Sequence, residues 1–207
     1  MSNPQAVDSA PFPAPSTQAR VNATPASGKS WDAVLYDGQP VLIRELREQD
    51  IEMERRFIER LSPQSRRFRF LGTLVSPSDN LLRQLVVLNP ARDVALIALI
   101  GTGAEQSEIG VARLSAEGDD TCEFAVTVSD EWHQKGLGTL LMQHLISNAI
   151  DRGIKSMHSI DAADNESMRE FAAHLGFRRT PDPDDATRVV HSLDLSKKSA
   201  RELPASA

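Results

Sequence analysis

The sequence has one cysteine and no long apolar run. Cys122 is the only cysteine among 207 residues, so the chain cannot form an internal disulfide or a zinc site built from several cysteines. No stretch reaches the roughly 18–20 consecutive apolar residues that span a bilayer. Residues 1–29 lack the basic start and the apolar centre of a signal peptide. We therefore expect a cytoplasmic protein that does not contact a membrane.

An excess of positive charge is also missing. Lysine and arginine number 23 against 29 aspartates and glutamates, which gives a net charge of -6 and a pI near 5.4. Binding to nucleic acid needs an electropositive surface. The cluster of Arg66, Arg67 and Arg69 could contact phosphate, but a solvated helical face is the commoner explanation for such a cluster in an acidic protein. We expect no nucleic-acid partner, and the acidic balance favours a cationic one.

Bulky apolar groups are scarce at both ends of the chain. Residues 1–30 are rich in proline, alanine and serine, and such a segment buries too little surface to offset the entropy lost on ordering. We predict a disordered N-terminal extension at residues 1–30 and a flexible tail at residues 196–207. With 40% hydrophobic residues overall, the chain can form one core. We place the single domain at residues 40–195.

Within that domain, hydrophobic periodicity predicts alternating strands and helices. Apolar spacing favours a strand at residues 41–46 and helices at residues 51–61 and 79–88. Three strand-like runs follow, and the glycine-containing turns between them indicate an antiparallel meander. These runs are residues 94–100, 109–114 and 122–128.

The second half of the domain contains one long amphipathic helix. Its apolar positions run from Leu137 to Ala149, and Gly153 stands where a left-handed C-terminal cap is needed. A short strand at residues 156–160 leads to Asn165, a good N-cap for a helix that ends near Leu175. Late strands follow up to Leu195. The order of elements predicts a mixed α+β fold.

The segment between the third strand run and the long helix carries the clearest chemical signal. It reads Trp132-His133-Gln134-Lys135-Gly136-Leu137-Gly138-Thr139. The first N–H groups of a helix lack internal acceptors, and glycines allow an anion to approach the backbone, so this loop is a candidate phosphate site. Lys135 could add a charge and Thr139 a hydroxyl donor. A G-x-G pair can also be an ordinary turn, and the third glycine of a dinucleotide motif is replaced by Leu141.

The loop resembles the pyrophosphate-binding motif of the GNAT superfamily of N-acetyltransferases, Q/R-x-x-G-x-G/A. A second segment, from Asn165 to Leu175-Gly176-Phe177, resembles the N-x-x-A…L-G-F segment of the same family. His133 stands where the family usually has glutamine or arginine. This departure leaves the glycines intact, but the contact that the family's glutamine or arginine side chain makes does not carry over to His133. The resemblance covers residues 40–195 and is closest to the catalytic domain of bacterial protein-lysine acetyltransferases.

The resemblance implies a fold and a cofactor site. The fold is a central, mostly antiparallel, twisted sheet of about six to seven strands flanked by about four helices. The co-substrate is acetyl-CoA, its pantetheine lies where the fourth and fifth strands splay apart, and no metal takes part. The implied cofactor-binding residues are Val126, Val128, His133, Gln134, Lys135, Gly136, Leu137, Gly138, Thr139 and Asn165.

The resemblance also implies direct attack of an amine on the thioester. An alkylammonium with a pKa near 10.4 must lose a proton first, so a carboxylate is needed as a general base. Glu123 lies within an apolar strand, where a charge is costly unless it is paired or functional. It also stands where the related lysine acetyltransferases have their catalytic glutamate. The alternative is a structural charge paired with an arginine such as Arg113.

The sequence is compatible with more than one general acid, acceptor and oligomeric state. The family's usual general acid, a tyrosine, falls on Ala172, and the only tyrosine, Tyr36, lies near the expected disordered extension. The chain is therefore an N-acetyltransferase or a non-catalytic acyl-CoA sensor. Cys122 is a buried hydrophobe or a nucleophile, and the histidines lack zinc-site spacing. The acceptor is a protein lysine or a small amine, and the chain is a monomer or a homodimer.

Overall fold

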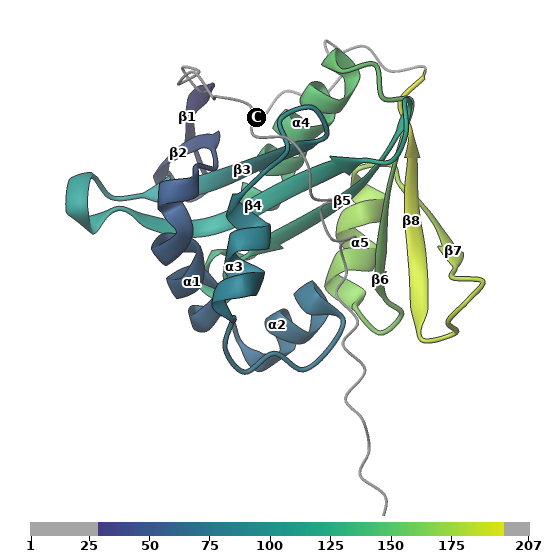
Figure 1. Ribbon diagram of the computed structural model, residues 1–207, viewed down its shortest axis with the longest axis horizontal. Coiled ribbons are helices and arrows are strands. Elements are labelled where there is room, and N and C mark those ends of the chain that lie inside the picture. The colour runs from purple at the N-terminus through teal and green to yellow at the C-terminus, as the bar shows by residue number, and fades with distance from the viewer. Residues whose placement is uncertain (1–28, 197–207) are drawn as a thin grey trace, which may run out of the picture.

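The computed structural model describes residues 29–196. The predicted disordered ends, residues 1–30 and 196–207, fall outside this range except at their inner limits. The described part forms a twisted sheet with helices on both faces (Figure 1).

Eight strands form the sheet, in the order β1-β2-β3-β4-β5-β6-β8-β7. Every neighbouring pair is antiparallel except β5 and β6, which are parallel. The strands are β1 (Ser30–Val34), β2 (Pro40–Glu45), β3 (Asp93–Ile100), β4 (Ser107–Ala116), β5 (Thr121–Val128), β6 (Ser156–Ala162), β7 (Arg178–Pro181) and β8 (Arg188–Asp194). The predicted α+β class is confirmed, and so is the antiparallel meander, which is β3-β4-β5.

Within the described residues the sheet has one strand more than the upper predicted count, and there are five α-helices instead of about four. The additional strand is β1, which pairs with β2 through Trp31 and Ile43, so the sheet begins before residue 40. The additional helix is α2. The helices are α1 (Ile51–Arg60), α2 (Pro63–Phe70), α3 (Asp79–Val86), α4 (Leu137–Asp151) and α5 (Glu166–His174), with short 3-10 turns at Glu48–Asp50, Gly103–Glu105 and Asp130–Trp132.

Helix α2 forms because its first turn is well capped. Ser62 has extended backbone angles, and its side chain accepts a hydrogen bond from the N–H of Ser65. Pro63 follows at the first helical position, where its fixed φ suits the helix and its missing N–H is not needed. The same Ser-Pro pair that ends α1 therefore starts α2.

The two faces of the sheet bury separate apolar clusters. Side chains alternate along a strand, so Leu96 and Ala98 of β3 pack toward α4, whereas Ile97 and Leu99 pack toward α1 and α3. Because helices cover both faces, β3 is apolar at nearly every position. The sheet is therefore the central layer, with a buried apolar cluster on each face.

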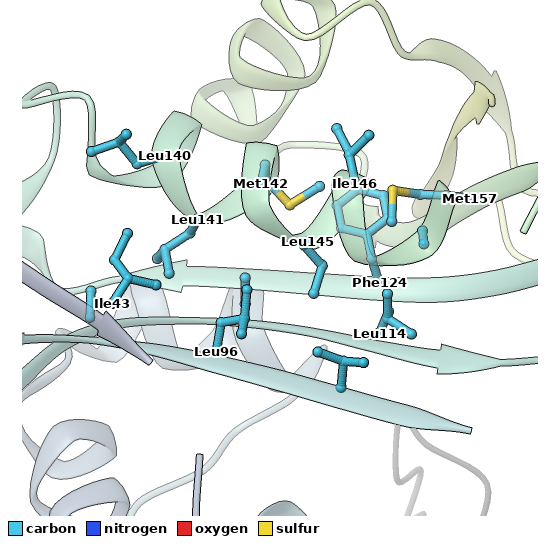
Figure 2. Packing of buried hydrophobic residues seen from close by; sticks show 14 of the residues in the cluster. Ile43, Leu96, Leu114, Phe124, Leu140, Leu141, Met142, Leu145, Ile146 and Met157 are labelled. Atoms are coloured by element: carbon cyan, nitrogen blue, oxygen red, sulfur yellow. The ribbon is translucent and has the colours of Figure 1, made fainter. Parts of the chain in front are cut away.

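Helix α4 packs along the middle of the sheet. Leu141, Met142 and Leu145 are fully buried against Leu96, Leu114 and Phe124 (Figure 2). The helix begins after Gly136, and Gly153, with a φ of +79°, follows its C-terminus as expected for a left-handed cap. This packing fixes the position of the N-terminus of α4.

Truncating Leu145 to alanine is expected to lower the free energy of unfolding by about 2–5 kcal/mol, because it leaves a cavity between α4 and the sheet. Urea denaturation measures the loss. The control is Val75→Ala, at a side chain that is 81% exposed, which should change stability by less than about 0.5 kcal/mol. Equal effects of the two substitutions would contradict this description of the core.

Candidate functional site

Strands β5 and β6 separate after a short paired region. Their parallel register covers only Thr121, Cys122 and Glu123 of β5, although both strands continue beyond it. The residues from Phe124 to Val128 therefore pair with β4 on one side and face a gap on the other. The strand that the resemblance counted as fourth is β5, because β1 precedes the predicted first strand.

Hydrogen bonds at the start of β5 show which backbone groups face the gap. The carbonyl oxygen of Asp120 accepts from the N–H groups of Lys155 and Ser156 on the β6 side, and that of Thr121 accepts from Glu117 on the β4 side. Backbone groups alternate in direction along a strand. Those of Val126 and Val128 thus point toward the gap, where they could pair with an extended ligand.

A cavity of about 510 Å³ lies between the gap and the start of α4. We call it the large cavity. It is lined by residues from α2, β5, the loop before α4, and α5. Eight of the residues implied by the resemblance line it, namely Val126, Val128, His133, Gln134, Gly136, Gly138, Thr139 and Asn165.

The loop of residues 132–138, which we call the glycine loop, presents the N-terminus of α4 to this cavity. Leu140 makes an intrahelical bond to the carbonyl of Gly136, so the N–H groups of Leu137, Gly138 and Thr139 precede the regular helical ladder. Side chains cap α2, α3 and α5 through Ser62, Ser78 and Asn165, but no described side chain caps α4. The N–H groups at the start of α4 are therefore placed to donate hydrogen bonds to an anion in the large cavity.

The backbone of the glycine loop is held in left-handed conformations. Gln134 has a φ of +60° and Gly136 a φ of +86°, and a residue with a Cβ is strained in this region. At Gly138 the room for a side chain is small, because an added Cβ would lie 3.2 Å from the ring of Phe171. Gly136 is thus required by its backbone conformation, whereas a Cβ at Gly138 would need only a small shift of the Phe171 ring.

The side chains of the remaining loop residues are placed differently. His133 lies at the edge of the cavity, with Nε2 2.9 Å from the carbonyl oxygen of Val128. The Lys135 side chain is not part of the cavity lining among the described residues: its Nζ lies 3.0 Å from Asp37 and 4.4 Å from the ring centroid of Trp132. Leu137 has its side chain in the core, so only its backbone N–H is available to a ligand.

Asn165 lies in the opposite wall of the cavity and is the N-cap residue of α5. Its Oδ1 accepts a hydrogen bond of 3.1 Å from the N–H of Met168 and so caps α5, as its N-cap position predicted.

Glu123 borders a second, smaller cavity of about 40 Å³, which we call the small cavity. The two cavities adjoin, since Phe68, Arg69, Val126, Asp161 and Met168 line both. Burial, together with the charges of Glu117 and Asp161 and against the opposing charge of Arg69, raises the pKa of Glu123 to about 7. A carboxyl with this pKa can take up a proton near neutral pH.

Arg113 is not the partner of Glu123. Its guanidinium donates to Glu54 at 2.9 Å and to the carbonyl oxygen of Leu85, which ties α1 and α3 to β4. Cys122 is fully buried, and burial raises the pKa of its thiol to about 12. The thiol is therefore protonated at neutral pH, and the interpretation of Cys122 as a buried hydrophobe holds.

Helix α2 lies across the gap, which sequence patterns alone did not indicate. At its start, the hydroxyls of Ser62 and Ser65 each donate to Asp130 at 2.7 Å. At its other end, Arg67 donates to Asp164 at 2.6 Å, next to Asn165. The helix is thus tied to the segments that follow β5 and β6, and Phe68 and Arg69 face both cavities.

A second carboxylate, Asp161 on β6, faces both cavities as well. Its Oδ2 lies 2.6 Å from the Ser159 hydroxyl and 2.9 Å from Nδ1 of His191, which is buried. These two donors fix its side chain. Only pairing of β6 with β8 brings His191 beside Asp161, so spacing in the sequence could not have revealed this group.

Two features are absent from residues 29–196, the part of the chain that the structure describes. No helix there has the length and apolar character needed to cross a membrane. No group of three or more histidine, cysteine, aspartate or glutamate side chains there is arranged to hold a metal ion.

Comparisons with known proteins agree with this geometry. Residues 77–177 match the model of the acetyltransferase (GNAT) family. The chain is 45% identical over 171 residues to acetyltransferase PA5475 of Pseudomonas aeruginosa, which covers 81% of this chain and 91% of the relative.

Solved structures share the fold at low sequence identity. The GNAT domain of S. lividans PAT aligns with a TM-score of 0.74 and 23% identity, covering 80% of this chain and 97% of that domain. The cAMP-binding acyltransferase from Mycobacterium smegmatis aligns with a TM-score of 0.60 and 23% identity over 86% of this chain and 50% of its own.

Proposed function

This chain belongs to the GNAT family of acetyltransferases, and on this premise we propose that it moves an acetyl group from acetyl-CoA to a primary amine. The observation that carries the proposal is the start of α4. Its first amides have no described side-chain cap, and they border a cavity that continues into the gap beside β5. An N-terminus of this kind suits a diphosphate.

The described residues fit the remaining parts of acetyl-CoA. The backbone groups of Val126 and the N–H of Val128 face the gap, so they suit the amides of pantetheine, whereas the carbonyl oxygen of Val128 already contacts Nε2 of His133. Asn165 stands near the point where the thioester would lie. When bound, acetyl-CoA supplies the activated acetyl group. The protein's own task is to hold it, exclude water and remove a proton from the acceptor.

Glu123 is the group that we propose as general base. Its carboxylate accepts a proton from the acceptor ammonium, which leaves a neutral amine able to form the new C–N bond as the C–S bond of the thioester breaks. The second proton of the amine is then lost from the new amide nitrogen, and the departing thiolate takes up a proton from water to leave as the free thiol. Asp161 and Glu123 give the small cavity two carboxyl groups beside Arg69, which favours a cationic acceptor. We propose a primary amine, either a protein lysine or a small molecule.

Steady-state release of CoA thiol tests the function. Thiol should appear only when both acetyl-CoA and an amine acceptor are present, and labelled acetyl-CoA added to a lysate should mark the acceptor for mass spectrometry. Label in proteins would identify a lysine substrate, and label only in small molecules would exclude one.

A non-catalytic acyl-CoA sensor is the second candidate. It is favoured by Ala172, which occupies the place of the family's tyrosine acid and is buried in the core. A sensor binds CoA and releases no acceptor-dependent thiol with any amine, so the same assay, run with a calorimetric titration, separates the two candidates.

The pKa of Glu123 predicts how the reaction depends on pH. The base must be deprotonated, so kcat/KM should fall about tenfold per pH unit below the pKa, which is about 7. Glu117→Gln removes a charge that raises this pKa, so the midpoint of the acidic limb should move to lower pH. A pH-rate profile of both proteins checks this. A profile that is flat between pH 5 and 7 would contradict the role of Glu123.

A further inference from the structure

The turn between β1 and β2 contacts the glycine loop. The N–H of Tyr36 donates to the carbonyl oxygen of Lys135 at 3.2 Å, and Asp37 lies 3.0 Å from Nζ of the same lysine. The ion pair lowers the pKa of Asp37. The turn is thus bound to the loop through both the backbone and a side chain.

The ring of Tyr36 occupies the place beside Gly136 where a side chain would otherwise stand. A Cβ added to Gly136 would lie 2.8 Å from Cζ and 2.9 Å from Cε2 of Tyr36, which is closer than any side-chain carbon tolerates. Among the described residues, Gly136 lines the large cavity and Tyr36 does not. The ring therefore packs on the part of the loop that is turned away from the cavity.

This contact adds little to the core. Tyr36 is 68% exposed, whereas its neighbour Leu35 is buried and anchors the turn. The loop that it covers includes Gln134, a non-glycine residue with a φ of +60°, and such a conformation persists only where the surrounding structure holds it.

We propose that Tyr36 is a positioning residue for the glycine loop: its ring and its backbone bond hold the loop so that the first amides of α4 face the large cavity. The inference rests on the proposed function, because a preformed set of donors matters only if an anion binds there. Holding the donors in place before binding reduces the conformational entropy lost when the diphosphate arrives.

Variants of the full chain test this role. Tyr36→Ala removes the ring and Tyr36→Phe keeps it. Val34→Ala is the control, since Val34 is 63% exposed on the same hairpin. Calorimetric titration with CoA should give a Kd raised roughly tenfold for the alanine variant, a loss of preorganisation, and a nearly unchanged Kd for the other two. The KM for acetyl-CoA should rise likewise, while kcat at saturation stays within about twofold because the ring does not meet the reacting atoms.

Hydrogen exchange of the loop amides in the ligand-free chain gives a second measurement. Tyr36→Ala should speed exchange at residues 134–138, and Val34→Ala should not. Wild-type exchange and wild-type Kd in Tyr36→Ala would overturn the proposal, and so would a phenylalanine variant as weak as the alanine variant. If the wild type bound no CoA, the proposed function would fail, but the exchange rates would still decide whether Tyr36 holds the loop.

Discussion

Glu123→Gln is expected to lower kcat by about 10²–10⁴-fold, the usual contribution of a general base, and to leave the Kd for CoA unchanged. Glutamine keeps the size and polarity of the side chain but cannot accept a proton from the acceptor. Steady-state thiol release and calorimetric titration, run on the same preparation, measure the two quantities. The acidic limb of the pH-rate profile should disappear with the carboxylate.

The control for this substitution is Glu131→Gln. Glu131 is an exposed carboxylate in the segment after β5, so the same chemical change at a side chain outside both cavities should leave kcat unchanged. A Glu123→Gln enzyme with wild-type kcat would show that the proton leaves by another route.

Glu123→Gln should not destabilise the fold at neutral pH. The pKa of Glu123 is raised from 4.5 to about 7 in the folded chain. Its contribution to stability is therefore present below pH 4.5 and is lost as the pH rises toward and through 7. Glutamine carries no such charge, so the variant should unfold at an equal or higher urea concentration at pH 8. Lost activity then cannot be ascribed to unfolding.

Gly136→Ala is expected to weaken CoA binding by about 10–100-fold, which corresponds to 1–3 kcal/mol of local strain. The alanine would have to adopt a φ near +86°, and its Cβ would collide with the ring of Tyr36. The exposed Tyr36 ring can move aside, but the strain at this φ remains and is expected to displace the loop together with the amides that follow it. Calorimetric titration with CoA measures the loss.

The matched control is Gly153→Ala at the other end of α4. Gly153 has a φ of +79°, and a Cβ added there meets no described atom within 4 Å. Both variants should lose stability because of backbone strain, but only Gly136→Ala should lose affinity for CoA. Equal Kd values for the two would mean that the glycine loop does not bind the cofactor.

Local patterns were sufficient to predict the parts of the site that lie on continuous segments. The glycines before α4, the apolar stripe of α4 and the N-cap at Asn165 each depend on residues a few positions apart. For the same reason the α+β class and the β3-β4-β5 meander followed from hydrophobic runs and glycine turns. The roles of Glu123 and the loop residues came from the family resemblance and remain predictions.

Contacts between distant segments could not be predicted in this way. Strand β1 is short, and it is defined by its pairing with β2. Tyr36 was expected near a disordered segment, but it packs on Gly136. The bonds from α2 to Asp130 and the pair of Asp161 with His191 likewise depend on how the sheet is assembled. Each joins side chains whose separation in the sequence carries no signal of contact.

A crystal structure of the full chain with bound CoA would show directly whether the start of α4 holds the cofactor. We expect diphosphate oxygens within hydrogen-bonding distance of the N–H groups of Leu137, Gly138 and Thr139, with the pantetheine arm beside Val126 and Val128. A structure in which CoA lies elsewhere, with those three amides bonded to oxygens of the protein itself, would contradict it.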